Sequence, residues 1–298
     1  MASGALRLAT RGSALARAQA ERVADLLGGA CELVIVSTEG DRKSQVPLWT
    51  IGGKGVFVKE VQQAVLDGRA DVAVHSAKDL PSLTPPGITI GAFPERLDPR
   101  DALVGSTLDA LPSGARVATG SARRRAQLAS LRPDLTFASL RGNVETRLER
   151  AADHHAAVLS YAALVRSGVT DRATEVLEPS VMLPQVGQGA LAVECREDDA
   201  ATLARLASID AAAVRAAVEA ERGYLKELGA DCSVPVGALA HPTAQGVRVE
   251  VAMASLDGHV SLRHVAQGAD PEATGRAAAR ELLDECGGRA ILDAGQPA

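Results

Sequence analysis

Aromatic side chains are scarce in this chain of 298 residues and make up only 2% of it. Hydrophobic residues still reach 46% and charged residues 23%, which is typical of a globular protein. The cores must therefore be built mainly from alanine, valine, leucine and isoleucine. A chain of this length exceeds one ordinary core, so the sequence predicts two or three domains.

Cysteine is also rare. The four cysteines, Cys31, Cys195, Cys232 and Cys286, are widely spaced and form no Cys-x-x-Cys pair. This spacing argues against a disulfide framework and against a zinc site, and no other cluster has the spacing of metal ligands, so we expect no metal. Cys31, Cys195 and Cys286 lie in strand-like or helix-like segments, and we interpret them as structural.

Long apolar runs and an excess of basic charge are absent. No apolar run approaches the ~20 residues of a membrane span, and residues 1–8 lack the pattern of a secretion signal. The net charge of −5 argues against binding to nucleic acid or to an anionic membrane. A reducing cytoplasm fits the cysteine pattern best, so we expect a cytoplasmic protein.

Strand-like and helix-like segments alternate along the chain, which predicts an α/β fold with mostly parallel sheets covered by helices. We expect strands at 5–10, 31–37, 71–75, 88–92, 116–119, 135–138, 156–160 and 190–195, and helices at 13–27, 55–66, 121–131, 143–152 and 161–168. Residues 38–53 are predicted to form a long loop. The strand at 190–195 is expected to rejoin the first domain.

A long helix is predicted for residues 210–229, with Asp210 as its cap, followed by strands at 247–254 and 259–265 and a helix at 271–286. The predicted domains are 1–95 with 188–208, then 96–187, then a smaller α+β domain at 209–298. In α/β sheets, ligands bind beyond the carboxyl ends of the strands. The polar turns at 10–13, 75–79 and 119–121 fall there.

One of these turns carries His75, Ser76, Lys78 and Asp79 directly after a buried strand. Asp79 either caps a following turn, or points into a cleft as a carboxylate that neighbouring cations keep ionised. For His75, a hydrogen-bonded residue at the strand end is favoured over a catalytic base.

The most basic segment is residues 119–147, where six arginines face two acidic residues. Thr119 and Ser121 lie at the start of a predicted helix, whose free N–H groups bind anions, and arginine binds carboxylates in a bidentate manner. The alternative is a solvated basic helix face, on which Arg125 and Arg132 are expected to lie at the surface.

Cys232 lies in a Gly- and Pro-punctuated turn after the long helix. It is either a packing thiol or a reactive one, and the adjacent Asp231 would raise its pKa, so reactivity requires basic neighbours from elsewhere in the fold. Lys54 lies in a Gly-Gly-Lys-Gly turn that does not match a phosphate-binding loop, and a tight helix entry is the alternative.

Nine segments in this order resemble the porphobilinogen deaminase (hydroxymethylbilane synthase) family. They are LATRGS (8–13), GGKGVFVKE (52–60), AVHSAKDLP (73–81), DPRDA (98–102), TGSARR (119–124), RPDL (132–135), LRGNV (140–144), PQVGQGA (184–190) and CSVPVG (232–237). The resemblance implies two α/β domains like those of type II periplasmic binding proteins, plus a smaller α+β C-terminal domain. It also implies a transferase of tetrapyrrole biosynthesis that joins four porphobilinogen molecules head to tail, loses ammonia each time, and releases hydroxymethylbilane by hydrolysis.

The resemblance further implies a dipyrromethane cofactor, attached through a thioether to Cys232, and a catalytic Asp79. The implied cofactor contacts are Ser76, Lys78, Thr119, Ser121, Arg123, Arg124 and Arg141, and the implied substrate contacts are Arg11, Ser13, Lys54, His75, Arg147, Arg166 and Gln188. Gly12, Ala230-Asp231 and Ser233 depart from the commoner family pattern. We expect a monomer with a small-molecule substrate.

The resemblance agrees with the charge pattern, because porphobilinogen carries two carboxylates and a growing chain requires an arginine-rich cleft without a globally basic protein. Two other functions remain open at this point. One is a non-catalytic protein that binds small anions with the same two-lobed fold. The other is an acyltransferase with a cysteine nucleophile, which would need a histidine near Cys232.

Overall fold

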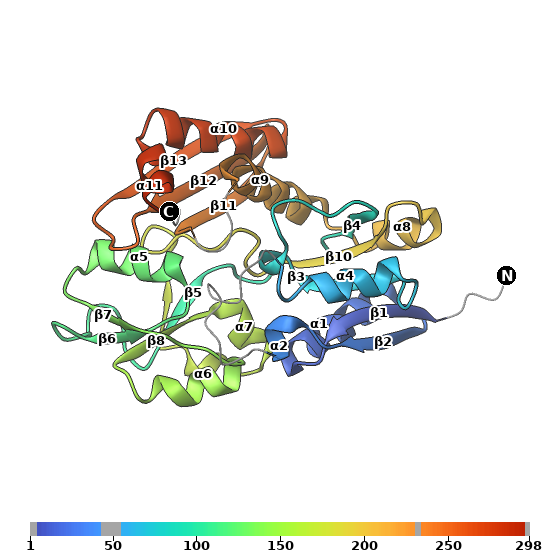
Figure 1. Ribbon diagram of the computed structural model, residues 1–298, viewed down its shortest axis with the longest axis horizontal. Helices are drawn as coiled ribbons and strands as arrows, with labels where there is room; N and C mark the ends of the chain where they lie inside the picture. The colour runs from blue at the N-terminus through green and yellow to red at the C-terminus, as the bar shows by residue number, and fades with distance from the viewer. Residues whose placement is uncertain (1–4, 43–54, 230–233, 296–298) are drawn as a thin grey trace. The chain divides into compact units, whose positions relative to one another are not determined.

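The computed structural model describes residues 5–42, 55–229 and 234–295 of the chain (Figure 1). Contacts between residues divide the chain into two compact units, residues 1–97 with 189–215, and residues 98–188 with 216–298. The chain therefore passes between the units after Leu97, after Gln188 and within one long helix. The three-domain division, with its boundaries, stays a prediction.

The first unit contains a five-stranded sheet in the order β2-β1-β3-β10-β4. Its strands are β1 (Leu6–Arg11), β2 (Cys31–Val36), β3 (Val72–Ser76), β4 (Ile88–Ala92) and β10 (Leu191–Arg196). Strands β1, β2 and β3 are parallel, whereas β10 runs antiparallel to both of its neighbours. The sheet is thus mixed, with β1, β2, β3 and β4 running in one direction and β10 running against them. Strand β10 enters from the other unit instead of through a helical crossover, so nothing imposes the parallel direction on it.

Apolar residues on alternate sides of the strands bury both faces of this sheet. On one face, Leu8 and Val74 form a core with helices α1 (Ala14–Leu27) and α8 (Ala200–Ala207). On the other face, Ala9 and Ala73 pack with helix α4 (Lys59–Leu66). Burial on both faces explains why the strands read as continuous apolar runs in the sequence. Residues 38–53 are not entirely loop, because Glu39–Arg42 forms the short helix α2, and residues 43–54 lie outside the described part.

The second unit repeats this topology in a sheet of order β7-β6-β8-β5-β9. Its strands are β5 (Asp101–Val104), β6 (Arg116–Ala118), β7 (Thr136–Ala138), β8 (Ala156–Ser160) and β9 (Glu175–Leu177). Helix α5 (Ala122–Leu131) covers one face and helix α6 (Val144–Ala151) the other, as Figure 1 shows. The helix α7 (Tyr161–Arg166) follows β8, and the 3-10 turns η1 (Ala77–Asp79) and η2 (Thr170–Arg172) complete this part of the fold. Strands β5 and β9 were not predicted from the sequence.

The second unit also holds an antiparallel sheet of β11 (Val236–Thr243), β12 (Gly246–Ala254) and β13 (Ser261–Gly268). Its core packs against α9 (Ala212–Leu228), α10 (Pro271–Asp284) and α11 (Gly288–Gly295). Strand β11 was missed, since its start at Pro235-Val236-Gly237 reads as a turn. Two mixed α/β sheets and a smaller antiparallel sheet with helices confirm the predicted fold class.

The sequence predicts that Asp210 caps the long helix. In the structure its carboxylate contacts the residue after β4 and an arginine of α9. It accepts a hydrogen bond from the Phe93 N–H at 2.7 Å and pairs with Arg215 at 2.6 Å. These contacts fix the start of α9 against the end of β4. Within the described residues, no helix is both long enough and apolar enough to cross a membrane.

Candidate active site

In the first unit, residues from the carboxyl ends of β1 and β3 line one pocket. Its polar lining comes from Arg11, Ser13, Gln19, His75, Ser76 and Asp79, with Phe57 beside them. Strands β1 and β3 are parallel neighbours, so their ends meet at the same edge of the sheet. The turns after these two strands were predicted to lie beyond the carboxyl ends of strands, and in the structure they line the same pocket.

Asp79 ends η1 and is half-buried at the pocket wall. Its carboxylate makes no hydrogen bond or ion pair with any residue in the described ranges 5–42, 55–229 and 234–295. Within these ranges, therefore, no hydrogen bond supports the alternative that Asp79 caps a turn. The pocket wall thus holds an uncommitted carboxylate, meaning one without a partner among the described residues, and Lys78 lies half-buried on the same turn.

Arg11 is held by an acidic residue. Its Nε lies 3.2 Å from each oxygen of Asp41, and its guanidinium stacks over the Phe57 ring at 4.2 Å from the centroid. Partial burial would raise the pKa of Asp41, but hydrogen bonds from Arg11 and Thr38 outweigh burial and lower it. Asp41 is therefore an anion that orients Arg11 at the pocket.

The two serines of the pocket have different uses. Ser13 caps α1 by accepting a hydrogen bond from the Ala16 N–H at 3.3 Å. The Oγ of Ser76 accepts a hydrogen bond from the Gln19 Nε2 at 2.8 Å. Because a hydroxyl can accept and donate at the same time, the Ser76 hydroxyl can still donate a hydrogen bond to an acceptor in the pocket. Gln19 was not predicted, since its position in an amphipathic helix carries no functional signal.

His75 is almost fully buried, with its Nε2 3.2 Å from an oxygen of Glu194, which is 1% exposed. The Gln62 amide donates to both oxygens of Glu194, at 3.1 and 2.9 Å. His75 thus lies beside a carboxylate at the end of β3, but its Nε2 makes no hydrogen bond within the described residues, so the expected hydrogen bond is not observed. It also contributes to the pocket wall.

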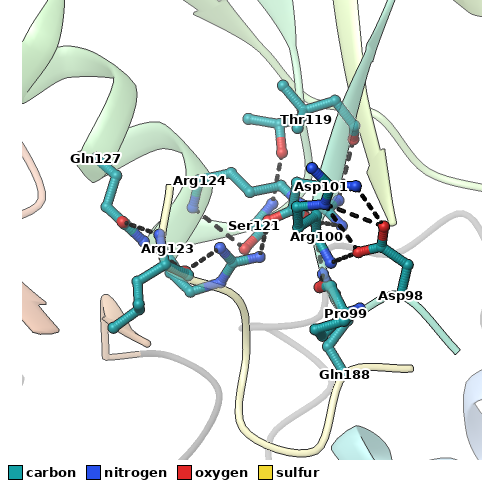
Figure 2. Close-up of polar contacts among 12 residues, drawn as sticks. Asp98, Pro99, Arg100, Asp101, Thr119, Ser121, Arg123, Arg124, Gln127 and Gln188 are labelled. Atoms are coloured by element: carbon teal, nitrogen blue, oxygen red, sulfur yellow. Dashed lines mark hydrogen bonds and ion pairs between the residues drawn. The ribbon is translucent and has the colours of Figure 1, made fainter. Parts of the chain in front are cut away.

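In the second unit, Asp101 is fully buried at the start of β5 and gathers charged groups around it (Figure 2). Its Oδ1 accepts from Arg124 Nε at 3.0 Å, from Arg124 Nη2 at 2.8 Å and from Gln188 Nε2 at 2.8 Å. Its Oδ2 lies 2.7 Å from Arg123 Nη2. Burial alone would raise the pKa of Asp101, but the two guanidinium groups lower it to about 2, so Asp101 is ionised at neutral pH.

Arg123 and Arg124 are 4% and 6% exposed, so the solvated-face alternative is wrong for both and holds for the exposed Arg125. Arg123 Nη1 donates to the carbonyl of Leu183 at 2.7 Å. Burial lowers the pKa of Arg123. The basic segment is therefore partly an internal cluster, which a sequence pattern alone does not distinguish from a surface face.

The helix start that holds these arginines is built as predicted. The Ser121 N–H donates to Thr119 Oγ1 at 3.2 Å, and Ser121 Oγ accepts from the Arg124 N–H at 3.4 Å as the cap of α5. Thr119 and Ser121 are therefore placed at a helix N-terminus, where backbone N–H groups favour an anion. This turn follows β6, as the sequence predicts.

Arg141 lies in the turn between β7 and α6 and is half-buried. Burial lowers the pKa of its guanidinium, and its Nη1 is buried without a hydrogen-bond partner in the described part of the chain. Arg147 Nε, in α6, donates to the Gly142 carbonyl at 2.8 Å. Arg166 is half-buried in the last turn of α7.

Gln188 is fully buried and its amide nitrogen binds Asp101 and the Pro99 carbonyl, at 2.8 and 2.7 Å. This hydrogen bonding to the protein itself was not foreseen from the sequence, where Gln188 is implied to contact substrate. Cys232 and Lys54 lie outside the described residues. Among the described residues there is no group of three or more His, Cys, Asp or Glu side chains that could hold a metal ion.

Comparison with known proteins gives the family. Residues 6–204 match the family model described as porphobilinogen deaminase, dipyromethane cofactor binding domain, and residues 215–284 match the porphobilinogen deaminase C-terminal domain. The chain belongs to the porphobilinogen deaminase family. The family predicted from nine sequence segments is thereby confirmed.

Relatives named porphobilinogen deaminase match over nearly their whole length. The protein from Roseiflexus sp. (strain RS-1) is 48% identical over 96% of this chain and 98% of its own. The protein from Acidothermus cellulolyticus is 47% identical over 93% of this chain and 88% of its own. Among solved structures, the methionine-binding protein MetQ covers 70% of this chain with a TM-score of 0.44 and 14% identity.

In this member of the porphobilinogen deaminase family, two of the described cysteines, Cys195 and Cys31, have thiols whose pKa is raised by burial. Cys195 is buried in β10, and burial raises its thiol pKa to about 11. Burial also raises the pKa of Cys31. A raised pKa removes the thiolate that is the reactive form, which agrees with the structural role predicted for both residues.

Proposed function

We propose that this chain condenses four porphobilinogen molecules head to tail and releases hydroxymethylbilane, as a transferase of tetrapyrrole biosynthesis. The observation that carries the proposal is the uncommitted carboxylate of Asp79 in a pocket within residues 6–204, which match the cofactor-binding domain of the family. A non-catalytic anion-binding protein would have no need for such a carboxylate.

Asp79 is proposed to stabilise the positive charge that develops on the pyrrole during the reaction. When porphobilinogen loses its amine, the C–N bond breaks, the amine leaves as ammonia with an added proton, and the remaining methylene pyrrole is electron-deficient. A C–C bond then forms to a ring carbon of the growing chain, and that carbon loses its proton. An ionised Asp79 stabilises the cation through the pyrrole N–H, and it can carry the proton between these two places. Positioned proton transfer of this kind contributes about 10²–10⁴-fold to a rate.

The arginines of the site are proposed to bind the carboxylates of porphobilinogen. Each porphobilinogen unit carries an acetate and a propionate, and a charged carboxylate leaves water only for a charged or bidentate partner. Arg141 has a buried Nη1 without a partner in the described chain, and Arg123 and Arg124 share a single carboxylate. These are the features expected of groups that await carboxylates from a ligand.

These residues fit a dipyrromethane, which brings four carboxylates of its own. Ser76, Lys78, Thr119, Ser121, Arg123, Arg124 and Arg141 would hold it, and Cys232 would anchor it by a thioether. When bound, it supplies the free pyrrole carbon to which the first substrate is joined. Arg11, Ser13, Lys54, His75, Arg147, Arg166 and Gln188 are proposed to surround the substrate and the growing chain, Ser13 and Gln188 through the turns they stabilise.

The intact mass of the denatured protein tests the proposal. We expect the wild-type chain to carry a covalent excess equal to two linked pyrrole units, and Cys232→Ser to carry none, because a serine cannot form the thioether. Cys195→Ser serves as the control, since that buried thiol is expected to keep the excess mass. A wild-type chain that stays unmodified after incubation with porphobilinogen would instead support an anion-binding protein.

Arg141→Ala is expected to slow assembly of the dipyrromethane cofactor at least ~10-fold, because the variant loses a partner for one of the cofactor carboxylates. A partly buried charged hydrogen bond to a carboxylate is worth about 1.5–3 kcal/mol. The gain of the two pyrrole units during incubation with porphobilinogen, followed by intact mass, measures it, with the exposed Arg125→Ala as the matched control. Equal rates of assembly in the two variants would remove Arg141 from the site.

A further inference from the structure

Asp101 lies behind the arginine pair and not on a surface. It is 0% exposed, and both of its oxygens face cationic or amide nitrogens between 2.7 and 3.0 Å away. In Figure 2 the guanidinium groups of Arg123 and Arg124, both from α5, converge on this one carboxylate from β5. The only acid so placed among the described residues near the pair is Asp101, since the neighbouring Asp98 is paired with Arg100 at 2.7 Å.

The carboxylate is itself fixed from a third direction. Gln188 Nε2 donates to Asp101 at 2.8 Å and to the Pro99 carbonyl at 2.7 Å, so the carboxylate is tied to the backbone just before β5. Arg124 is anchored further by its Nη1, which donates to the Val158 carbonyl at 3.0 Å. The carboxylate of Asp101 is thus held in place, and it restricts the positions of the two long arginine side chains that pair with it.

The charges of this cluster do not cancel. Two guanidinium cations share one carboxylate, which leaves one net positive charge on groups that are almost fully buried. The Nε of Arg123 has no hydrogen-bond partner among the described residues. A buried and uncompensated charge is unfavourable, so this cluster of described residues favours the binding of one further anion. Without Asp101 two positive charges would remain, and they would repel each other.

We propose that Asp101 is a positioning residue: it holds Arg123 and Arg124 side by side for a carboxylate of the dipyrromethane and sets the charge of the pair to one. This inference rests on the proposed function. It assigns a role in cofactor loading to an aspartate that touches neither cofactor nor substrate.

Loading kinetics test the role of Asp101. Protein produced without a supply of porphobilinogen is mixed with porphobilinogen, and intact mass follows the gain of the two pyrrole units with time. The rate is divided by the folded fraction, measured by circular dichroism on the same sample. We expect Asp101→Asn to load at least about tenfold more slowly than wild type per folded molecule. The control Asp134→Asn, which breaks an exposed ion pair with Arg132 in the same unit, is expected to load at the wild-type rate.

Asp101→Glu covers the case in which Asp101→Asn does not fold. It keeps the charge but moves the carboxylate by one methylene, so its rate per folded molecule is expected to lie between those of wild type and Asp101→Asn. A merely structural role would lower the folded fraction and leave the rate per folded molecule unchanged, which would overturn the proposal. If the wild type itself gained no pyrrole mass, the proposed function would fall and this inference with it. Normal loading of wild type with equal loading of both Asp101 variants would remove only the role of Asp101.

Discussion

Asp79→Asn is expected to lower turnover of porphobilinogen at least ~10³-fold while the chain stays folded. The amide keeps the size of the carboxylate but removes the negative charge that stabilises the cation and the group that carries the proton. Preorganised electrostatic groups and general acid–base groups each contribute about 10²–10⁴-fold, so losing both roles at once has a large effect. Ammonia release and hydroxymethylbilane formation, per molecule loaded with cofactor, measure it.

The fold should tolerate this change. Asp79 is half-buried and its carboxylate has no partner in the described chain, so its replacement breaks no internal hydrogen bond. Asp67→Asn is the matched control, because Asp67 is an exposed carboxylate at the end of α4. We expect it to leave turnover and Tm unchanged. Wild-type turnover in folded and loaded Asp79→Asn would show that catalysis does not use this charge.

Gly275→Ala is expected to cost about 3 kcal/mol of stability, which corresponds to a fall in Tm of roughly 10 °C. Helices α9 and α10 cross at this glycine, where an added Cβ would lie 1.8 Å from the Ala220 carbonyl oxygen and 2.8 Å from the Tyr224 nitrogen. Both are backbone atoms and cannot move aside alone. Alanine favours a helix over glycine by only ~1 kcal/mol, so the clash outweighs the gain.

The crossing is tight from both sides, because a Cβ on Gly223 of α9 would lie 2.4 Å from the Glu272 carbonyl oxygen. Gly29→Ala is the control, since Gly29 is exposed and its nearest neighbour would be the flexible Arg205 side chain at 3.5 Å. Thermal unfolding of the two variants should therefore differ clearly. A Gly275→Ala variant as stable as wild type would mean that the helices separate at little cost.

Much of the fold could be predicted because its signals are local. Strands such as β3 and β8 are continuous apolar runs, and caps such as Ser13 and Ser121 precede amphipathic helices. The short strands β5 and β9 were missed. The direction of β10 was not predicted, since strand direction depends on where the chain re-enters the sheet.

The candidate site divides in the same way. Its residue types were predictable, because Asp79, the serines and the arginines lie in turns that follow strands. Their partners were not. The partners Asp41, Asp101, Glu194 and Gln19 lie 22 to 119 positions away along the chain from the site residues they contact, so no local pattern points to them.

The sequence by itself determined the family and the α/β class, and it supplied the residues that are proposed to carry chemistry, because these depend on local composition and on motifs in a fixed order. Only the tertiary structure decided that Arg123 and Arg124 are buried on one carboxylate while Asp79 has no partner among the described residues. The physical reason is that burial and charge pairing are properties of groups brought together by folding. Whether a charged side chain pairs within the protein or is available to bind a ligand therefore depends on neighbours that the linear sequence does not reveal.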